Sequence, residues 1–177
     1  MNSYPSLILI AGTARNVGKT TIACSIIKRV SAYKKVIGLK LTSIREDEEY
    51  HHACHDMPKT FSILEETQFN SHKDTSRMKR AGAVSSYWIV SREKYLEQAV
   101  NRFLSMIEDN VCLLAESAIL HQYIQPNLFI IIDRKDALHK KDYIIDLRPL
   151  ANIWIDDLLL LDRILLEDKV DLTCLKS

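Results

Sequence analysis

The stretch Leu7-Ile-Leu-Ile-Ala-Gly-Thr-Ala-Arg-Asn-Val-Gly-Lys-Thr-Thr21 decides the fold of this chain. Its first four residues form a short, continuous apolar run, which is typical of a strand buried inside a parallel sheet. After Gly18, apolar side chains follow at helical spacing, at Ile22, Ile26, Ile27 and Val30. The stretch therefore predicts a strand, a glycine-containing loop and a helix in direct succession.

The loop between this strand and this helix has the residue types of a phosphate-binding loop. Glycines permit backbone conformations in which successive N–H groups turn inward and form a nest for an anion. Lys19 can reach the β- and γ-phosphates, and the Thr20 hydroxyl is placed to ligate Mg²⁺. The expected cofactors are therefore Mg²⁺ and ATP or GTP. The expected nucleotide contacts are Gly12, Thr13, Ala14, Arg15, Asn16, Val17, Gly18, Lys19, Thr20 and Thr21.

Apolar runs and helical patterns alternate along the rest of the chain. Strands are predicted at 7–10, 36–41, 84–90, 111–114, 128–132 and 152–155, and helices at 19–33, 74–81, 93–108 and within 158–166. Residues 42–72 are polar and weakly periodic, and we expect no regular element there. The alternation predicts one α/β domain over 1–177, with a doubly wound, mainly parallel sheet covered by helices on both faces.

Composition excludes several classes of protein. The chain has 24 Lys and Arg against 23 Asp and Glu, so the net charge of +1 provides no general basic surface for nucleic acid. No apolar run is long enough to cross a bilayer, and the first residues lack the pattern of a signal peptide. The four cysteines form no Cys-x-x-Cys pair. We expect a cytoplasmic protein that binds neither membrane nor nucleic acid.

Acidic residues at strand and helix ends are the remaining candidates for chemistry. Glu116 ends the predicted strand 111–114, where a carboxylate can hold Mg²⁺ or orient an attacking group. The alternative is a surface carboxylate. Asp74 is a second candidate for Mg²⁺, with plain helix capping as its alternative. Asp136 follows the strand 128–132, at a position from which it can recognise a nucleotide base, although a solvated charge cluster is the simpler interpretation.

The loop sequence Gly-Thr-Ala-Arg-Asn-Val-Gly-Lys-Thr, with five residues between Gly12 and Gly18, resembles that of dethiobiotin synthetase and its relatives among the P-loop NTPases. Gly38-Leu-Lys40 is similar to the Gly-x-Lys of the same group. The resemblance implies a P-loop NTPase fold, and it implies that Lys40 helps to bind substrate and the transferred phosphate. Ser43 is a further candidate for contact with that phosphate.

A second resemblance lies in the middle of the chain. His72-Lys-Asp-Thr-Ser-Arg-Met-Lys-Arg-Ala-Gly-Ala83 is similar to a Lys-Asp-Ser/Thr-x-Arg-x-x-x-Ala-Gly-Ala segment of the molybdopterin-guanine dinucleotide biosynthesis B proteins, which are GTP-binding adaptors. Both resembled families have glycine after the acidic residue of the Glu116 strand, where this chain has Ser117. The cluster His51, His52, Cys54 and His55 permits a metal site, although a polar substrate-side loop is the simpler interpretation.

Two classes of function follow, and a third stays open. The chain is predicted to be an Mg²⁺-dependent binder of ATP or GTP that hydrolyses it or transfers phosphate to an unidentified small substrate, with Lys19, Lys40 and Glu116 as catalytic residues. Thr20, Glu116 and Asp74 would bind the metal. The alternatives are a GTP-binding adaptor of molybdenum cofactor biosynthesis and a nucleotide binder without turnover. The oligomeric state is left open between monomer and symmetric homodimer.

Overall fold

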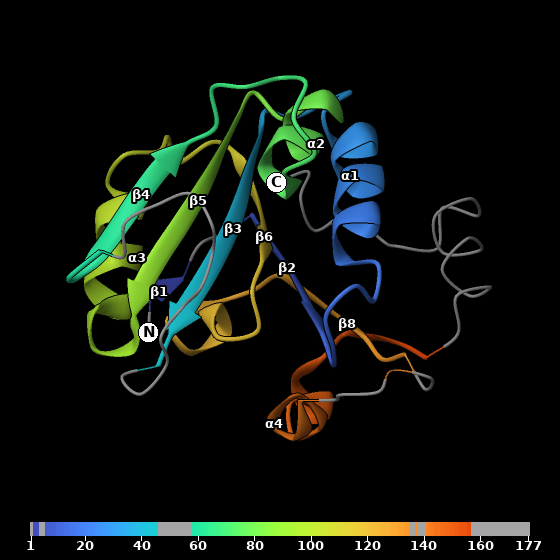
Figure 1. Ribbon diagram of the computed structural model, residues 1–177. Coiled ribbons are helices and arrows are strands. Elements are labelled where there is room, and N and C mark those ends of the chain that lie inside the picture. Colours follow the sequence, from blue (N-terminus) through green and yellow to red (C-terminus); the bar gives the residue numbers. More distant parts are fainter. Residues whose placement is uncertain (1, 4–5, 46–57, 135–136, 138–140, 157–177) are drawn as a thin grey trace.

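The computed structural model describes residues 2–3, 6–45, 58–134, 137 and 141–156 (Figure 1). In this part of the chain a seven-stranded sheet has the order β4-β5-β3-β6-β2-β8-β9. Its strands are β2 (Leu7–Gly12), β3 (Val36–Ile44), β4 (Phe61–Glu65), β5 (Ser85–Arg92), β6 (Cys112–Glu116), β8 (Leu128–Ile132) and β9 (Ile153–Ile155). Neighbouring strands are parallel except β4, which runs antiparallel to β5. Two short segments, β1 (Asn2–Ser3) and β7 (Ile124–Gln125), pair separately.

Helices pack against both faces of the sheet. α1 (Lys19–Val30) and α2 (Asp74–Arg80) contribute to one apolar cluster, while α3 (Leu96–Leu104) and α4 (Asp142–Ile145) contribute to the cluster on the opposite face. Figure 1 shows α1 and α2 beside each other and α3 behind β4 and β5. Three single turns, η1 (Glu93–Tyr95), η2 (Leu120–Gln122) and η3 (Arg148–Leu150), connect the larger elements. The predicted α/β class with a mainly parallel sheet is confirmed.

The central strand β2 explains why its sequence is continuously apolar. Ile8 and Ile10 pack in the cluster with α1, whereas Leu7 and Leu9 pack in the cluster with α3. Since successive side chains of a strand point to opposite faces, a strand covered on both faces has no solvent-facing positions. No helix in the described residues is long and apolar enough to cross a membrane.

The elements differ from the sequence predictions around α3 and at β4. The predicted helix 93–108 starts with the separate turn η1, and α3 already ends at Leu104. β4 lies inside 42–72, where no element was expected; it is an edge strand whose side chains are only partly buried, so its apolar pattern is weak. The helix predicted within 158–166 falls outside the described residues.

Gly38 in β3 controls how closely α2 approaches the sheet. A Cβ atom at this position would lie 2.8 Å from Met78 Sδ and 3.0 Å from Met78 Cβ, and Met78 is fully buried. The missing side chain therefore lets α2 pack directly on β3. Since Lys40 is two residues further along β3, on the same face, this contact also brings the first turn of α2 over Lys40.

Gly38→Ala is expected to lower the free energy of unfolding by about 1–3 kcal/mol, because the new methyl group displaces α2. Elsewhere in a strand, glycine to alanine is neutral or stabilising. Urea denaturation should show a smaller loss when the same change is made in a Met78→Ala background, where the closest contact, Met78 Sδ, has been removed. Equal losses in the two backgrounds would contradict this packing argument.

Candidate functional site

The loop Gly12–Thr21 connects β2 to α1, and two of its residues have a left-handed backbone. Gly18 has φ 98° and Asn16 has φ 56°, both in the left-handed region. At Gly12 there is no room for a side chain, because a Cβ atom would lie 2.4 Å from Val17 Cγ2. The loop is therefore tightly folded on itself directly before the first turn of α1.

The start of the loop is anchored to the chain that follows β8. The Thr13 amide donates to Ile132 O at 2.9 Å, and the Thr13 hydroxyl donates to Asp133 Oδ1 at 2.9 Å. From the other side, the Lys141 amide donates to Thr13 O at 2.7 Å. These bonds fix the first half of the loop between β8 and α4.

Lys19 folds back over the loop, and its Nζ atom donates to Ala14 O at 3.1 Å. Burial is the main reason that the pKa of Lys19 is lowered. Glu116 and Asp74 act in the opposite direction, whereas the positive charges of Lys141 and Lys40 lower the pKa further. A desolvated ammonium group among other cations is stabilised by an anion, so this position favours a phosphate ligand.

The hydroxyl of Thr20 lies between two carboxylates. Thr20 Oγ1 is 3.0 Å from Asp74 Oδ1 and 3.2 Å from Glu116 Oε2. A hydroxyl has one proton and can donate to only one of these oxygens at a time. When the hydroxyl donates to one carboxylate, its oxygen faces the oxygen of the other carboxylate with no hydrogen from Thr20 between them. A proton on that carboxylate, or a bound cation, is needed to stabilise this second contact.

Glu116 is the buried member of this pair, only 5% exposed at the end of β6. Burial and the charge of Asp74 raise its pKa to about 7, although Thr20, Lys19 and Lys40 act against the shift. Its second oxygen, Oε1, is buried without a hydrogen-bond partner. Glu116 therefore has an unused ligand atom inside the site, and the alternative of a surface carboxylate is wrong.

Asp74 pairs with Lys40 through Oδ2. Burial disfavours its ionised form, but the hydrogen bond and charge of Lys40, together with the Thr20 hydroxyl, outweigh burial and lower its pKa. Asp74 is the first residue of α2, and the capping position is Lys73, with no side-chain cap. The alternative that Asp74 caps the helix is therefore wrong.

These oxygen atoms fit a hard cation such as Mg²⁺. Mg²⁺ prefers oxygen ligands and is usually held by one or two carboxylates together with water and phosphate oxygens. Thr20, Asp74 and Glu116 provide that kind of incomplete protein set. Among the described residues no group of three His, Cys, Asp or Glu side chains could hold a metal by themselves, so water or phosphate oxygens would complete the coordination.

A buried carboxylate that the sequence analysis missed holds α2 in place. Glu66 accepts from the Thr75 hydroxyl at 2.8 Å and from the Gln68 amide at 2.9 Å. The Ser86 hydroxyl donates to Thr75 O at 2.8 Å. These bonds fix the residue after Asp74 to both β5 and the segment that follows β4. A glutamate in a long polar stretch has no sequence signal of its own, so only the fold identifies it.

Other predicted site residues have different outcomes. Ser43 lies on the opposite face of β3 from Lys40, because it is three positions further along the strand, and its hydroxyl is buried without a partner. Its predicted contact with the transferred phosphate is therefore wrong. Asp136 and the cluster His51, His52, Cys54 and His55 lie outside the described residues. Cys24 and Cys112 are free thiols.

Comparison of the chain with protein-family models, with curated proteins and with solved structures finds no match. The chemistry of this site therefore has to be argued from its own residues.

Glu116→Gln should change how stability depends on pH in buffer without divalent cations. The pKa of Glu116 rises from an ordinary 4.5 to about 7 in the folded protein. Its contribution to stability is therefore complete below pH 4.5 and is lost as the pH rises through 7. Relative to wild type, Glu116→Gln should gain on the order of 2–3 kcal/mol of unfolding free energy between pH 5 and pH 8.

Urea denaturation at the two pH values measures this difference. Glu97→Gln, a change at an exposed glutamate of α3, is the matched control and should show no such gain. If Glu116→Gln behaves like this control, Glu116 ionises as an ordinary surface glutamate and the description of its environment is wrong.

Proposed function

We propose that this protein binds the Mg²⁺ complex of ATP or GTP in the loop Gly12–Thr21 and either hydrolyses it or transfers its terminal phosphate to a small substrate. The fold proposed with this function is the doubly wound P-loop NTPase class. The observation that carries the proposal is the meeting of Thr20 with Asp74 and Glu116 directly after the loop. Three oxygen ligands from three different elements converge where a phosphate-bound cation would lie.

The balance of charge at this place supports a polyphosphate ligand. Lys19, Lys40 and Arg77 bring three positive charges, against Asp74 and a glutamate whose pKa is about 7. In the described part of the site, cations therefore exceed anions, as a magnesium–nucleotide complex of net negative charge requires. Loop amides at the start of α1 would add further donors, since the N-terminus of a helix favours anions.

The chain's own residues would contribute mainly positioning and charge. Lys19 would exchange its bond to Ala14 O for phosphate oxygens, which satisfies the buried ammonium group. Thr20, Asp74 and Glu116 would hold Mg²⁺, which on binding neutralises phosphate charge. Lys40 lies opposite Glu116 in the register of β3 and β6. It would bind the transferred phosphate next to the metal ligand Asp74.

The connected set of ligands supports turnover rather than a binder that has lost its chemistry. Thr20, Asp74, Lys40 and Glu116 belong to one chain of contacts. A site that had lost its chemistry would not need to keep all four in contact. We therefore favour an enzyme that acts on a small substrate over a binder without turnover, and the GTP-binding adaptor of molybdenum cofactor biosynthesis stays the alternative.

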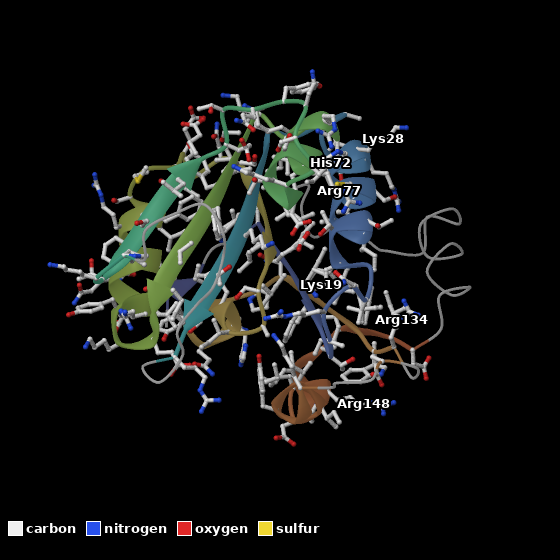
Figure 2. The ribbon with its side chains drawn as sticks, in the orientation of Figure 1. Lys19, Lys28, His72, Arg77, Arg134 and Arg148 are labelled. Atoms are coloured by element: carbon white, nitrogen blue, oxygen red, sulfur yellow. The ribbon has the colours of Figure 1, made fainter. Side chains whose placement is uncertain are left out.

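Calorimetric titration with MgATP and MgGTP tests the proposal. Wild type should bind at least one of them, and Lys19→Ala should weaken that binding by about 10- to 100-fold or more, since a charge-assisted bond to phosphate is lost. Lys28→Ala, at an exposed lysine in the last turn of α1 (Figure 2), is the matched control. Absence of binding in a folded wild-type protein would refute the function.

The metal assignment has a test of its own. Asp74→Asn should weaken nucleotide binding in the presence of Mg²⁺ by about 10-fold or more, because a ligand charge is lost. In EDTA the same change should leave binding equal or tighter, because a negative charge beside the phosphates has been removed. A loss of the same size in both buffers would mean that Asp74 serves only to position Lys40 and α2.

A further inference from the structure

Arg77 is a cationic residue beside the loop Gly12–Thr21. Neither the packing of the fold nor the binding of the metal explains why its side chain lies there. It lies one helical turn after Asp74 in α2, so both side chains face the first turn of α1. Arg77 Nη2 donates to Thr21 Oγ1 at 3.4 Å, and Nη1 lies 3.8 Å from Asp74 Oδ1. Figure 2 shows Arg77 where α2 meets α1, on the same side of the sheet as Lys19.

The other cationic residues of α2 hydrogen-bond to backbone carbonyl groups and so stabilise the structure around the helix. Arg80 donates through one nitrogen to Phe69 O, Ser71 O and Ser76 Oγ, and thereby holds the segment before the helix. Lys79 donates to Glu66 O at 2.9 Å. Arg77 makes no comparable bond to a backbone carbonyl among the interactions of the described residues. Its contacts are directed toward Thr21 and Asp74, which belong to the site.

Neither contact of Arg77 is strong enough to explain its position. Charge-assisted hydrogen bonds have donor–acceptor distances of roughly 2.7–2.9 Å, and both contacts of Arg77 are clearly longer. Asp74 already has a close cationic partner in Lys40, so it does not need a second one. A guanidinium group carries five donors in a planar fork that matches phosphate oxygens. Most of that capacity is available at the edge of the loop.

We propose that Arg77 is a phosphate-binding residue of this site, with its guanidinium group held by Thr21 and Asp74 at the start of α1 and bound to an oxygen of the polyphosphate when ligand is present. The proposal rests on the proposed phosphate site, and it extends the ligands of that site from the loop to α2. The helix would then contribute both a metal ligand, Asp74, and a phosphate ligand one turn later.

The experiment uses inorganic tripolyphosphate with Mg²⁺ as the probe, beside MgATP and MgGTP, in calorimetric titrations of the full chain. Arg77→Ala should weaken tripolyphosphate binding about tenfold, the change expected for one charge-assisted contact. Arg77→Lys keeps the positive charge but loses the paired donors of the planar guanidinium group, so its affinity for tripolyphosphate should lie between those of wild type and Arg77→Ala. Arg102→Ala, at an exposed arginine on α3 across the sheet, is the matched control and should bind like wild type.

The outcomes separate this proposal from the proposed function. Tripolyphosphate binding that depends on Arg77, without binding of either nucleotide, would support Arg77 and refute the nucleotide. Equal nucleotide and tripolyphosphate binding by wild type and Arg77→Ala would overturn the role of Arg77 and leave the function standing. No binding of any probe by wild type would overturn both. If Arg77→Ala lowers the melting temperature strongly, Arg77→Lys decides, and unchanged tripolyphosphate affinity in that variant overturns the proposal.

Discussion

The hydroxyl of Thr20 is the point on which the geometry of the site depends. Its contacts to Asp74 and Glu116 join α1, α2 and β6 at one point of the described site. Each carboxylate alone would be an ordinary feature of a strand or helix end. Together, the two carboxylates place two acceptor oxygens beside a hydroxyl that has one proton to donate. The oxygen that receives no proton can be satisfied by a cation, so these three groups suit a metal ion.

Packing that has no chemistry of its own sets these positions. α2 can lie over β3 only because Gly38 has no side chain, and its rotation is fixed by the buried bonds of Glu66, Thr75 and Ser86. Asp74 precedes Thr75 directly, so the register of those bonds determines where the carboxylate lies. The position of a ligand in the first turn of a seven-residue helix is thus decided by the hydrogen bonds of the residue that follows it.

The sequence predicted the structure best where a residue type or pattern is compatible with few backbone conformations or environments. The strand 128–132 and the loop Gly12–Thr21 could be placed because continuous apolar runs and glycines with left-handed backbone have few alternatives. Thr20, Glu116 and Asp74 were each predicted as metal ligands, but the hydrogen bonds that join them were not, because contacts over 54 and 96 residues leave no local pattern. β4 and Glu66 were missed for a related reason: an edge strand and a buried polar anchor acquire their role only from neighbours distant in sequence.

The strand order of the sheet also affects how the protein can form. β2 and β3 are the first two long strands in the chain, yet they do not pair with each other, since β6 lies between them. The centre of the sheet can therefore be completed only after residues as late as Cys112–Glu116 are present. During synthesis, β2 and β3 remain apolar strands with unpaired inner edges until that segment emerges. Pairing between distant parts of a chain slows folding and leaves hydrophobic surface exposed in folding intermediates. The N-terminal segment with β2 and β3 would therefore be the part of the chain that depends on chaperones.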